Sequence, residues 1–404
     1  MVPRILISLN TEHLKKLVIA LYTGMLVILA VATFAEYGWG SDFATQTVYH
    51  SPFFVLWWAA LVVLTLMVCY RKKIWKQVPV GLLHLSFVVI LLGAGLSFLT
   101  SRKGVMHLRI GQQSFHYMEQ EEGWMHELPF TLSLDTFYVE YYPGTETPSD
   151  YISVVRCSAL EEGKQPVTIA MNKVFDCKGF RFYQASYDED ELGTVLSVNY
   201  DPWGTGVTYI GYALLALSMV GMLLNRKGEF RRLLRQPVFG MVLVVCLLLG
   251  GCLFYVCVGR RAPLIPVLNS PLLYVHVSLI MVSYTLLAFM LVNGILALCL
   301  PRKAHGLMML SRLLLYPAVF LLGLGIFVGA VWANVSWGRY WAWDPKEVWA
   351  LITFMVYGLP FHTHSLARFR KPKFLHIYLI AAFLTVLMTY FGVNFFLGGM
   401  HSYA

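Results

Sequence analysis

Charged residues are scarce in this 404-residue sequence, at only 13% of the total. Soluble domains carry about 25%, so the composition excludes an ordinary soluble protein. Several motifs are also missing: Cys-x-x-Cys, Walker A, Gly-x-Gly-x-x-Gly and a motif-supported Ser-His-Asp arrangement. Their absence argues against a thioredoxin-like enzyme, a c-type haem protein, a nucleotide-binding enzyme and a serine hydrolase.

Cysteine is sparse too, with seven residues. Five of them lie in or beside apolar runs and are most simply packing residues. Cys157 and Cys177 fall in the one long polar interval of the chain. A disulfide between them is possible in an oxidising compartment, but the spacing alone leaves both the reduced and the oxidised state open.

Long apolar runs, by contrast, dominate the chain. Because about 20 apolar residues can cross the hydrocarbon core as a helix, the runs predict transmembrane helices. We expect nine, at about 16–35, 52–70, 79–100, 206–224, 237–257, 272–300, 312–333, 346–365 and 374–397. The first is not a cleaved signal peptide, because it is long and the residues after it make a poor small-residue cleavage site.

Lys and Arg are distributed unevenly between the two sides of these spans. The segments that alternate onto one side carry 19 of them and the opposite segments, outside the long interval, carry 4. The positive-inside rule therefore places the N-terminus in the cytoplasm and the C-terminus outside. The net charge of +9 is then mostly a topology signal, and it does not indicate nucleic-acid binding.

The interval 101–203 between the third and fourth spans holds 16 acidic and 8 basic residues. Strand-like patterns at 131–135, 152–155 and 167–187, with a turn signal at Pro143-Gly144, predict a β-rich outer domain. The fold class is therefore an all-α polytopic membrane protein of about nine transmembrane helices. The β-rich extracytoplasmic domain is inserted between helices 3 and 4.

A tryptophan segment, defined here as residues 337–349, lies between two of the apolar runs. It holds Trp337, Trp341, Trp343 and Trp349 in thirteen residues, mixed with charges. One interpretation is an aromatic belt at the membrane interface. The density favours a second interpretation, a flat platform for a large, planar, partly apolar ligand at the outer surface.

Four of the twelve histidines form two pairs by depth in this topology. His84 and His362 lie toward the cytoplasmic side, whereas His276 and His401 share the outer level of the tryptophan segment. Ionisable residues in spans are costly and indicate function, and paired imidazoles are natural axial ligands of haem iron. The alternative is that each is a neutral imidazole hydrogen-bonded to a neighbouring helix.

Zinc binding is not favoured, because the histidines lie on separate spans without clustered carboxylates. Asp344 and Glu347 stand three residues apart at the start of a predicted span. A carboxylate pair in a first helical turn favours the helix dipole, so these two side chains are expected to cap that helix.

The tryptophan segment resembles the WWD signature of haem-handling membrane proteins of cytochrome c maturation. The matching residues are Trp337-Gly338, then Trp341-Ala-Trp343-Asp344, then Glu347. The tail from Thr389 through Asn394 to His401 is similar to the end of the CcsA family, as is the stretch Leu272–Tyr284 around His276.

The N-terminal half is similar to the partner family, CcsB or ResB. The resembling segments are 48–54, 82–87, 92–97, 182–187 and 200–204. The resemblance divides the chain into 1–100 (CcsB/ResB-like helices 1–3), 101–205 (outer domain), 206–235 (CcsB/ResB-like helix 4 and linker) and 236–404 (CcsA-like domain, WWD segment 332–349). The chain thus resembles a CcsB–CcsA fusion, with a smaller outer domain than is usual for that family.

What this resemblance implies is a system II cytochrome c synthase, a haem lyase of the bacterial inner membrane. Haem b, bound non-covalently as substrate, would pass from His84 and His362 to an outer site. The resemblance assigns His276 and His401 to that site as catalytic iron ligands, beside Trp337, Trp341, Trp343 and Asp344. Its partners would be membrane lipid, an apocytochrome c with a CxxCH motif on the periplasmic side and a thioredoxin-like thiol reductant.

Two other functions remain compatible with these residues. A b-type cytochrome with two bis-histidine haems would explain the histidine pairs, although not the tryptophan segment. A haem exporter or chaperone without ligase activity would explain both features.

Overall fold

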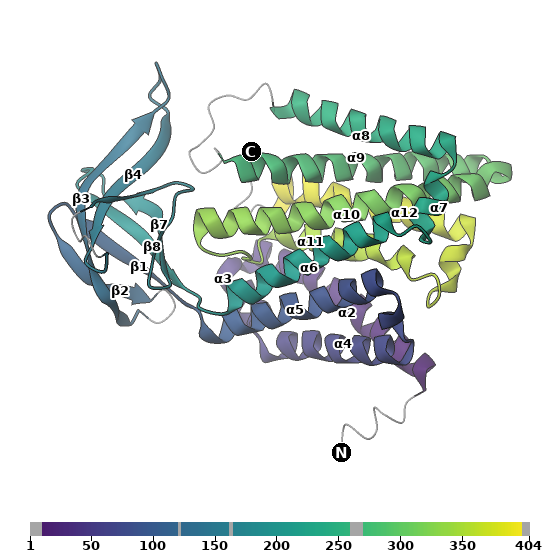
Figure 1. Cartoon of the computed structure of the whole chain (residues 1–404), viewed down its shortest axis with the longest axis horizontal. Helices are drawn as coiled ribbons and strands as arrows, with labels where there is room; N and C mark the ends of the chain where they lie inside the picture. Colours follow the sequence, from purple (N-terminus) through teal and green to yellow (C-terminus); the bar gives the residue numbers. More distant parts are fainter. Residues whose placement is uncertain (1–9, 120–122, 161–164, 259–269, 398–404) are drawn as a thin grey trace.

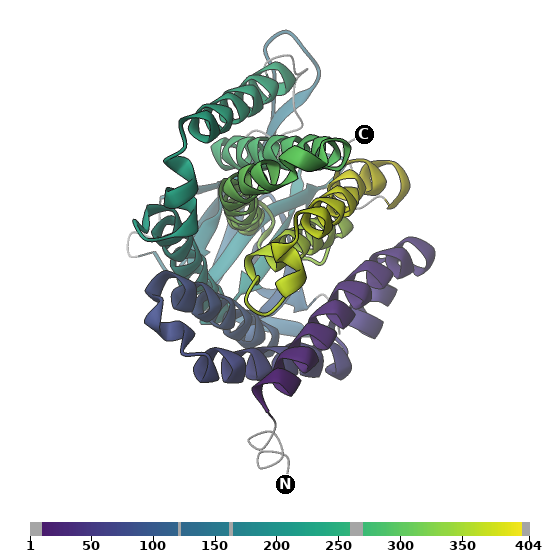
Figure 2. The same cartoon turned by 90° about the vertical axis from the view of Figure 1, so that its right-hand side faces the viewer.

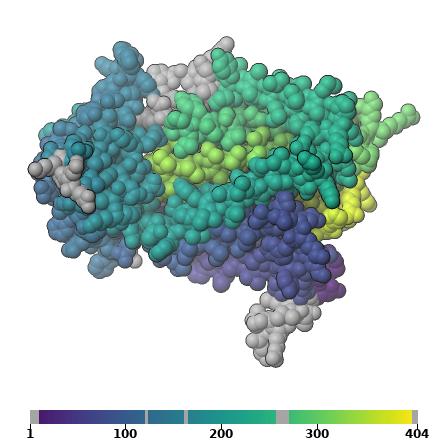
Figure 3. Space-filling model, viewed as in Figure 1, coloured from purple at the N-terminus to yellow at the C-terminus, as the bar shows by residue number. Residues whose placement is uncertain are grey.

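The computed structural model describes residues 10–119, 123–160, 165–258 and 270–397. A helical bundle carries a β domain at one end (Figures 1 and 3). The N-terminal and middle helices are α2 (Thr11–Trp39), α3 (Ser41–Ala44), α4 (Pro52–Arg71), α5 (Val78–Thr100), α6 (Gly204–Leu224), α7 (Glu229–Leu234) and α8 (Pro237–Val258). The C-terminal helices are α9 (Pro271–Cys299), α10 (Ala304–Trp337), α11 (Pro345–Gly358) and α12 (Pro372–Leu387), and α12 continues as a π-helix over Met388–Leu397.

Eight helices in the described part of the chain are long and apolar enough to cross a membrane. They coincide with eight of the nine predicted spans. The remaining one, 346–365, contains α11, which has only 14 residues, followed by a 3₁₀ turn at Leu359–Phe361. That helix ends earlier than we expected, so the count of nine spans stays a prediction.

The predicted outer domain is an antiparallel sheet in the order β5-β4-β3-β2-β1-β8-β7-β6. Its strands are β1 (Arg102–Arg109), β2 (Gln113–Glu119), β3 (Met125–Tyr141), β4 (Pro148–Cys157), β5 (Val167–Ala170), β6 (Phe175–Cys177), β7 (Phe180–Tyr187) and β8 (Gly193–Tyr200). Alternate residues point into one core, among them Met106, Leu132 and Leu196, as the period of two requires. The β-rich character that the sequence predicts is confirmed.

The two helices that flank the β domain are bound tightly to each other. A Cβ on Gly93 of α5 would lie 2.6 Å from the backbone nitrogen of Thr208 of α6, so only glycine permits this approach. Asp201 accepts hydrogen bonds from the backbone N–H groups of Gly204 and Thr205, each at 2.9 Å. This bonding caps α6 and explains the Asp-Pro-Trp-Gly motif that precedes it.

The bundle consists of two groups of helices around a central space. In Figure 2, α2, α4 and α5 form one wall and the helices of the C-terminal half form the opposite wall. The main core lies in the C-terminal group, with fully buried leucines at 286, 287, 313 and 322. A second core joins α2 to α11 through Met25, Leu29 and Ile352.

Candidate functional site

A single cavity of about 3170 Å³ lies between the two groups of helices. It is lined by residues of α2, α4, α5, α6, α10 and α11. His84 and His362 line it at the end away from the β domain, which we call the inner end. Trp341, Trp343 and Asp344 line it at the outer end, so one cavity connects two of the predicted groups of site residues.

The structure brings His84 and His362 together. Their ring centroids are 6.2 Å apart and the ring planes are perpendicular, at 87°. His84 Nδ1 lies 2.8 Å from the carbonyl oxygen of Val80, and His362 Nδ1 lies 3.2 Å from that of Gly358. Because a carbonyl oxygen only accepts, each Nδ1 donates this hydrogen bond, and Nε2 is the ring nitrogen that can bind a metal ion.

This geometry suits two axial ligands of one metal ion. With metal–nitrogen bonds of about 2 Å, two imidazoles on opposite sides of one ion place their centroids about 6 Å apart. A hydrogen bond from the far ring nitrogen to a carbonyl is the usual support of a metal-binding histidine. The residues therefore fit a bis-histidine haem iron.

The loop of the tryptophan segment turns sharply at its beginning. Gly338 ends α10 with a φ of 75°, a conformation that favours glycine. A Cβ there would lie 2.7 Å from the ring of Tyr183 in β7. Burial raises the pKa of the Tyr183 phenol, so this ring stays neutral and packs the β domain against the loop. Asn199 of β8 also donates a hydrogen bond to the Gly338 carbonyl.

Trp341 and Trp343 do not form one flat platform. Their rings meet edge to face at 86°, with centroids 5.8 Å apart. Trp343 has a left-handed backbone, with φ of 60°, and its ring stacks on Tyr49 at 4.7 Å. The predicted flat surface is therefore two perpendicular rings, because the turn at Trp343 rotates one side chain away from the other.

Carboxylates fix the end of this loop, as the sequence predicts. Asp344 is the N-cap of α11 and accepts a hydrogen bond from the Lys346 N–H at 2.9 Å. Glu347 accepts one from the Ala342 N–H at 2.8 Å. Lys346 reaches the tail motif, where its ammonium group donates to Asn394 at 2.8 Å. Asp344 thus caps α11 as predicted, whereas the hydrogen bond of Glu347 holds the loop residue Ala342 ahead of the helix.

His276 packs against α10 and does not line the large cavity. Its Nδ1 is 2.7 Å from the carbonyl oxygen of Gly325 in α10, so this ring also carries its hydrogen on Nδ1. Trp337 packs on Trp332, with ring centroids 4.9 Å apart, beside the first turns of α9. Neither His276 nor Trp337 lines the large cavity. His401, its predicted partner, lies outside the described residues.

Sequence reasoning missed several residues that position the loop. Tyr49 stacks on Trp343, and Tyr340 donates a hydrogen bond to Ser97 at 2.8 Å. Ser97 in turn donates to Asp201 at 2.6 Å. Tyr49, Ser97 and Asp201 all lie in segments that carried the family resemblance. That resemblance was the signal that could have identified them as residues of the site.

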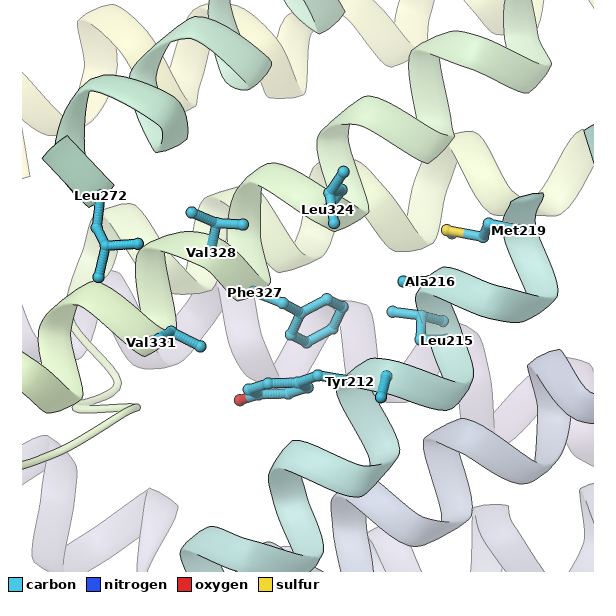
Figure 4. A pocket seen from close by; sticks show the side chains of 10 residues that line it. Tyr212, Leu215, Ala216, Met219, Leu272, Leu324, Phe327, Val328 and Val331 are labelled. Atoms are coloured by element: carbon cyan, nitrogen blue, oxygen red, sulfur yellow. The ribbon is translucent and has the colours of Figure 1, made fainter.

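A second, smaller cavity of about 250 Å³ lies between α6 and α10. Apolar side chains such as Leu215, Leu324 and Val331 line it, and Tyr212 and Phe327 lie side by side within it (Figure 4). No histidine lines it, so it is not a candidate for iron ligation.

Two family models match the chain. The ResB-like family matches residues 71–208, and the family described as cytochrome C assembly protein matches residues 203–401. The second match includes α6, which the sequence analysis assigned to the first half. The predicted resemblance to both families in one polypeptide is confirmed.

Three curated relatives each match between 35% and 42% of the chain. Protein NrfI of Wolinella succinogenes is 40% identical over 152 residues, which are 35% of this chain and 17% of that protein. Cytochrome c biogenesis protein CcsA of Chlamydomonas reinhardtii is 35% identical over 188 residues, 42% of this chain and 52% of that protein. CcsA of Guillardia theta is 37% identical over 175 residues, which are 36% of this chain and 58% of that protein. The chain therefore matches between about a sixth and three fifths of these relatives' lengths.

Proposed function

Because this chain joins a ResB-like segment to a cytochrome C assembly segment in one multi-pass membrane protein, we propose that it is a cytochrome c synthase. In this proposal it carries haem b across the membrane as a non-covalent substrate. It then attaches the haem to the CxxCH motif of an apocytochrome c. The observation that carries the proposal is one cavity that contains both the His84–His362 pair and the tryptophan loop.

The inner histidines hold the haem iron on its way across. Both Nδ1–H groups are bonded to helix carbonyls, so both Nε2 atoms are ready to ligate without a change of tautomer. A porphyrin with two propionates crosses lipid only at a high free-energy cost. A protein-lined cavity with paired ligands lowers that cost.

At the outer end the proposal assigns haem contact to Trp341 and Trp343 and iron ligation to His276 and His401. Because His276 does not line the large cavity, the haem must pass beyond that cavity to reach it. Each cysteine thiol of the apocytochrome adds across one haem vinyl group. The S–H bond breaks, an S–C bond forms, and the hydrogen goes to the neighbouring carbon, so nothing leaves and the addition involves no net redox change. The reaction needs reduced thiols and an exposed vinyl edge, and positioning contributes much of the rate.

This function requires the orientation that the charge distribution predicts. The tryptophan loop and the β domain lie at the same end of the bundle (Figure 1), which the proposal places outside the cytoplasmic membrane, facing the apocytochrome. The N-terminus and the inner histidines face the cytoplasm, where haem is made. A thioredoxin-like protein would keep the apocytochrome thiols reduced.

One alternative has support from a specific observation. The 6.2 Å histidine pair suits a b-type electron-transfer cytochrome as well as a transporter. Such a protein would keep its haem and would not attach it to another polypeptide. A haem exporter would likewise leave the apocytochrome unmodified.

Co-expression distinguishes these functions. The protein is produced with a CxxCH apocytochrome in a host that lacks maturation genes, and covalent haem is detected by peroxidase staining after denaturing electrophoresis. We expect a stained apocytochrome band, whereas acid–acetone removes all haem from the synthase itself. A haem-loaded synthase with no stained apocytochrome would favour the exporter or the electron-transfer protein.

A further inference from the structure

The ionisable residues that line the cavity differ sharply between its two ends. At the outer end the lining holds five carboxylates, those of Glu36, Asp42, Glu119, Asp201 and Asp344, and two basic side chains, Lys103 and Arg339, so acidic residues are in excess there. At the inner end the lining holds lysines 15, 72, 73, 76 and 227. Glu229 lines the same end, but its carboxylate is bonded to Arg312 at 2.7 Å. The cavity is therefore basic at one mouth and acidic at the other.

Four of these lysines, which we name the lysine collar, are Lys72, Lys73, Lys76 and Lys227. All four are exposed, and none forms an ion pair with a residue in the described part of the chain. Lys15, in contrast, pairs with Glu12 at 2.6 Å. The collar thus presents several ammonium groups with no protein carboxylate bound to them.

The backbone places the lysine collar at the inner end of the cavity, near His84 and His362. Lys76 precedes α5 by two residues, and His84 is the seventh residue of that helix, about 9 Å along its axis from Val78, where the helix begins. The propionate carboxylates of a haem held by His84 would lie a comparable distance from the iron, near the start of α5. Lys227 approaches from the turn after α6. Lys73 has a φ of 53°, a conformation in which a lysine side chain is unusual.

We propose that the lysine collar binds the two propionate carboxylates of haem while His84 and His362 hold its iron. This inference rests on the proposed function. It assigns an orientation: the propionate edge faces the cytoplasm and the opposite, vinyl-bearing edge points toward the outer end. The acidic outer end repels the propionates, so the electric field of the cavity favours the same orientation. The haem then advances with the edge that forms the thioether bonds in front.

The simpler explanation is that these lysines only determine topology, as basic residues beside cytoplasmic helix ends do. It predicts no preference for a ligand with carboxylates. Cytoplasmic residues Arg302 and Lys303, in the turn before α10, do not line the cavity. They offer a control that removes the same number of positive charges from the same side of the membrane.

The experiment compares ferric haem with haem dimethyl ester, in which both carboxylates are blocked. Each is titrated into full-length, haem-depleted protein in a neutral detergent, and the bis-histidine absorbance spectrum is recorded. We expect the wild type to bind haem about twentyfold more tightly than the ester, since each lysine–carboxylate pair contributes a factor of about five. Lys72→Gln combined with Lys76→Gln should lower this preference and leave affinity for the ester unchanged. Arg302→Gln combined with Lys303→Gln should keep it.

Two results would overturn the lysine collar. One is an unchanged preference for haem in the collar variant, and the other is an equal loss of affinity for both compounds. His84→Ala separates this inference from the proposed function. If that variant binds both compounds as the wild type does, the histidine pair is not a haem site and the proposed function loses its support. If His84→Ala weakens both and the collar variant weakens neither, only the collar is wrong.

Discussion

A single methyl group on Gly329 should disable the outer site. Gly329 lies on α10, facing His276 of α9, and a Cβ there would lie 2.6 Å from Nδ1 and 2.7 Å from Cε1 of the imidazole. Contacts between such atoms normally exceed about 3.4 Å, so the ring must move by about 1 Å. The ring is also hydrogen-bonded to the Gly325 carbonyl at 2.7 Å, and that bond cannot survive such a shift unchanged.

The size of the effect follows from these contacts. Loss of the hydrogen bond costs about 1 kcal/mol and a strained rotamer about 1 kcal/mol more, so Gly329→Ala destabilises the native position of the ring by about 2 kcal/mol. A misplacement of about 1 Å reduces a rate about 100-fold. We therefore expect cytochrome synthesis to fall about 100-fold with haem still bound at the inner site.

The assay measures covalent haem on the co-expressed apocytochrome, normalised to synthase protein in the membrane. Gly306→Ala is the matched control: it lies on the same helix, and a Cβ there meets nothing within 4 Å. Added imidazole should partly restore synthesis in Gly329→Ala by filling the vacated axial position. Wild-type synthesis in Gly329→Ala would refute the assignment of His276 to the outer haem.

Three further changes test other parts of the structure. His84→Ala should lower the haem-to-protein ratio and cytochrome synthesis together, and an unchanged ratio would remove the inner site. Trp343→Phe should reduce haem retention about three- to tenfold, because the stacked pair loses about 1 kcal/mol, whereas Phe at the exposed Trp39 should have no effect. Cys157 and Cys177 lie in contact, with sulfurs 3.5 Å apart, so mild oxidation should link them and stabilise the β domain by about 3 kcal/mol. Burial and the adjacent Cys157 thiol raise the pKa of Cys177; oxidation should therefore be slow at neutral pH and accelerate as pH rises, and alkylation of both thiols after oxidation would contradict the link.

The helices could be predicted because membrane spans leave a strong local signal. Eight predicted spans coincide with observed apolar helices, since about 20 residues without charge have few alternatives in a bilayer. The segment 346–365 failed in length because the α-helix α11 ends at Gly358, a 3₁₀ turn containing Pro360 follows, and the backbone leaves helical geometry at His362. A hydropathy pattern is an average over many residues, so it does not detect where such a helix ends. The order of strands in the sheet depends on long-range pairing, which no local pattern contains.

The site was predictable in its members but less so in its geometry. Depth in the membrane paired His84 with His362 before any contact was known, and the structure places the two rings 6.2 Å apart. Depth also paired His276 with the tryptophans, yet that ring lies apart from the cavity that Trp341 and Trp343 line. A depth argument gives position along one axis only. The side of the bundle on which a residue lies depends on helix packing, which the sequence does not state.

On the proposed function, the separation of the two ends predicts that the protein binds two haems at once, one at the inner histidines and one at the tryptophan loop. Ser97, bonded to Tyr340 of the tryptophan loop, is 13 residues beyond His84 on α5, about 20 Å along the helix. One porphyrin cannot contact both levels. The cavity volume of about 3170 Å³ is also more than three times that of a pocket for a drug-sized ligand, about 300–1,000 Å³.

Protein purified from haem-replete cells should therefore contain more than one haem per chain, approaching two. The His84→Ala variant, reloaded with haem in detergent, should bind only one haem per chain. Saturation of the wild type at one haem per chain would show that the two ends are alternative positions of a single molecule. In that case each transfer must empty the inner histidines before the next haem can enter.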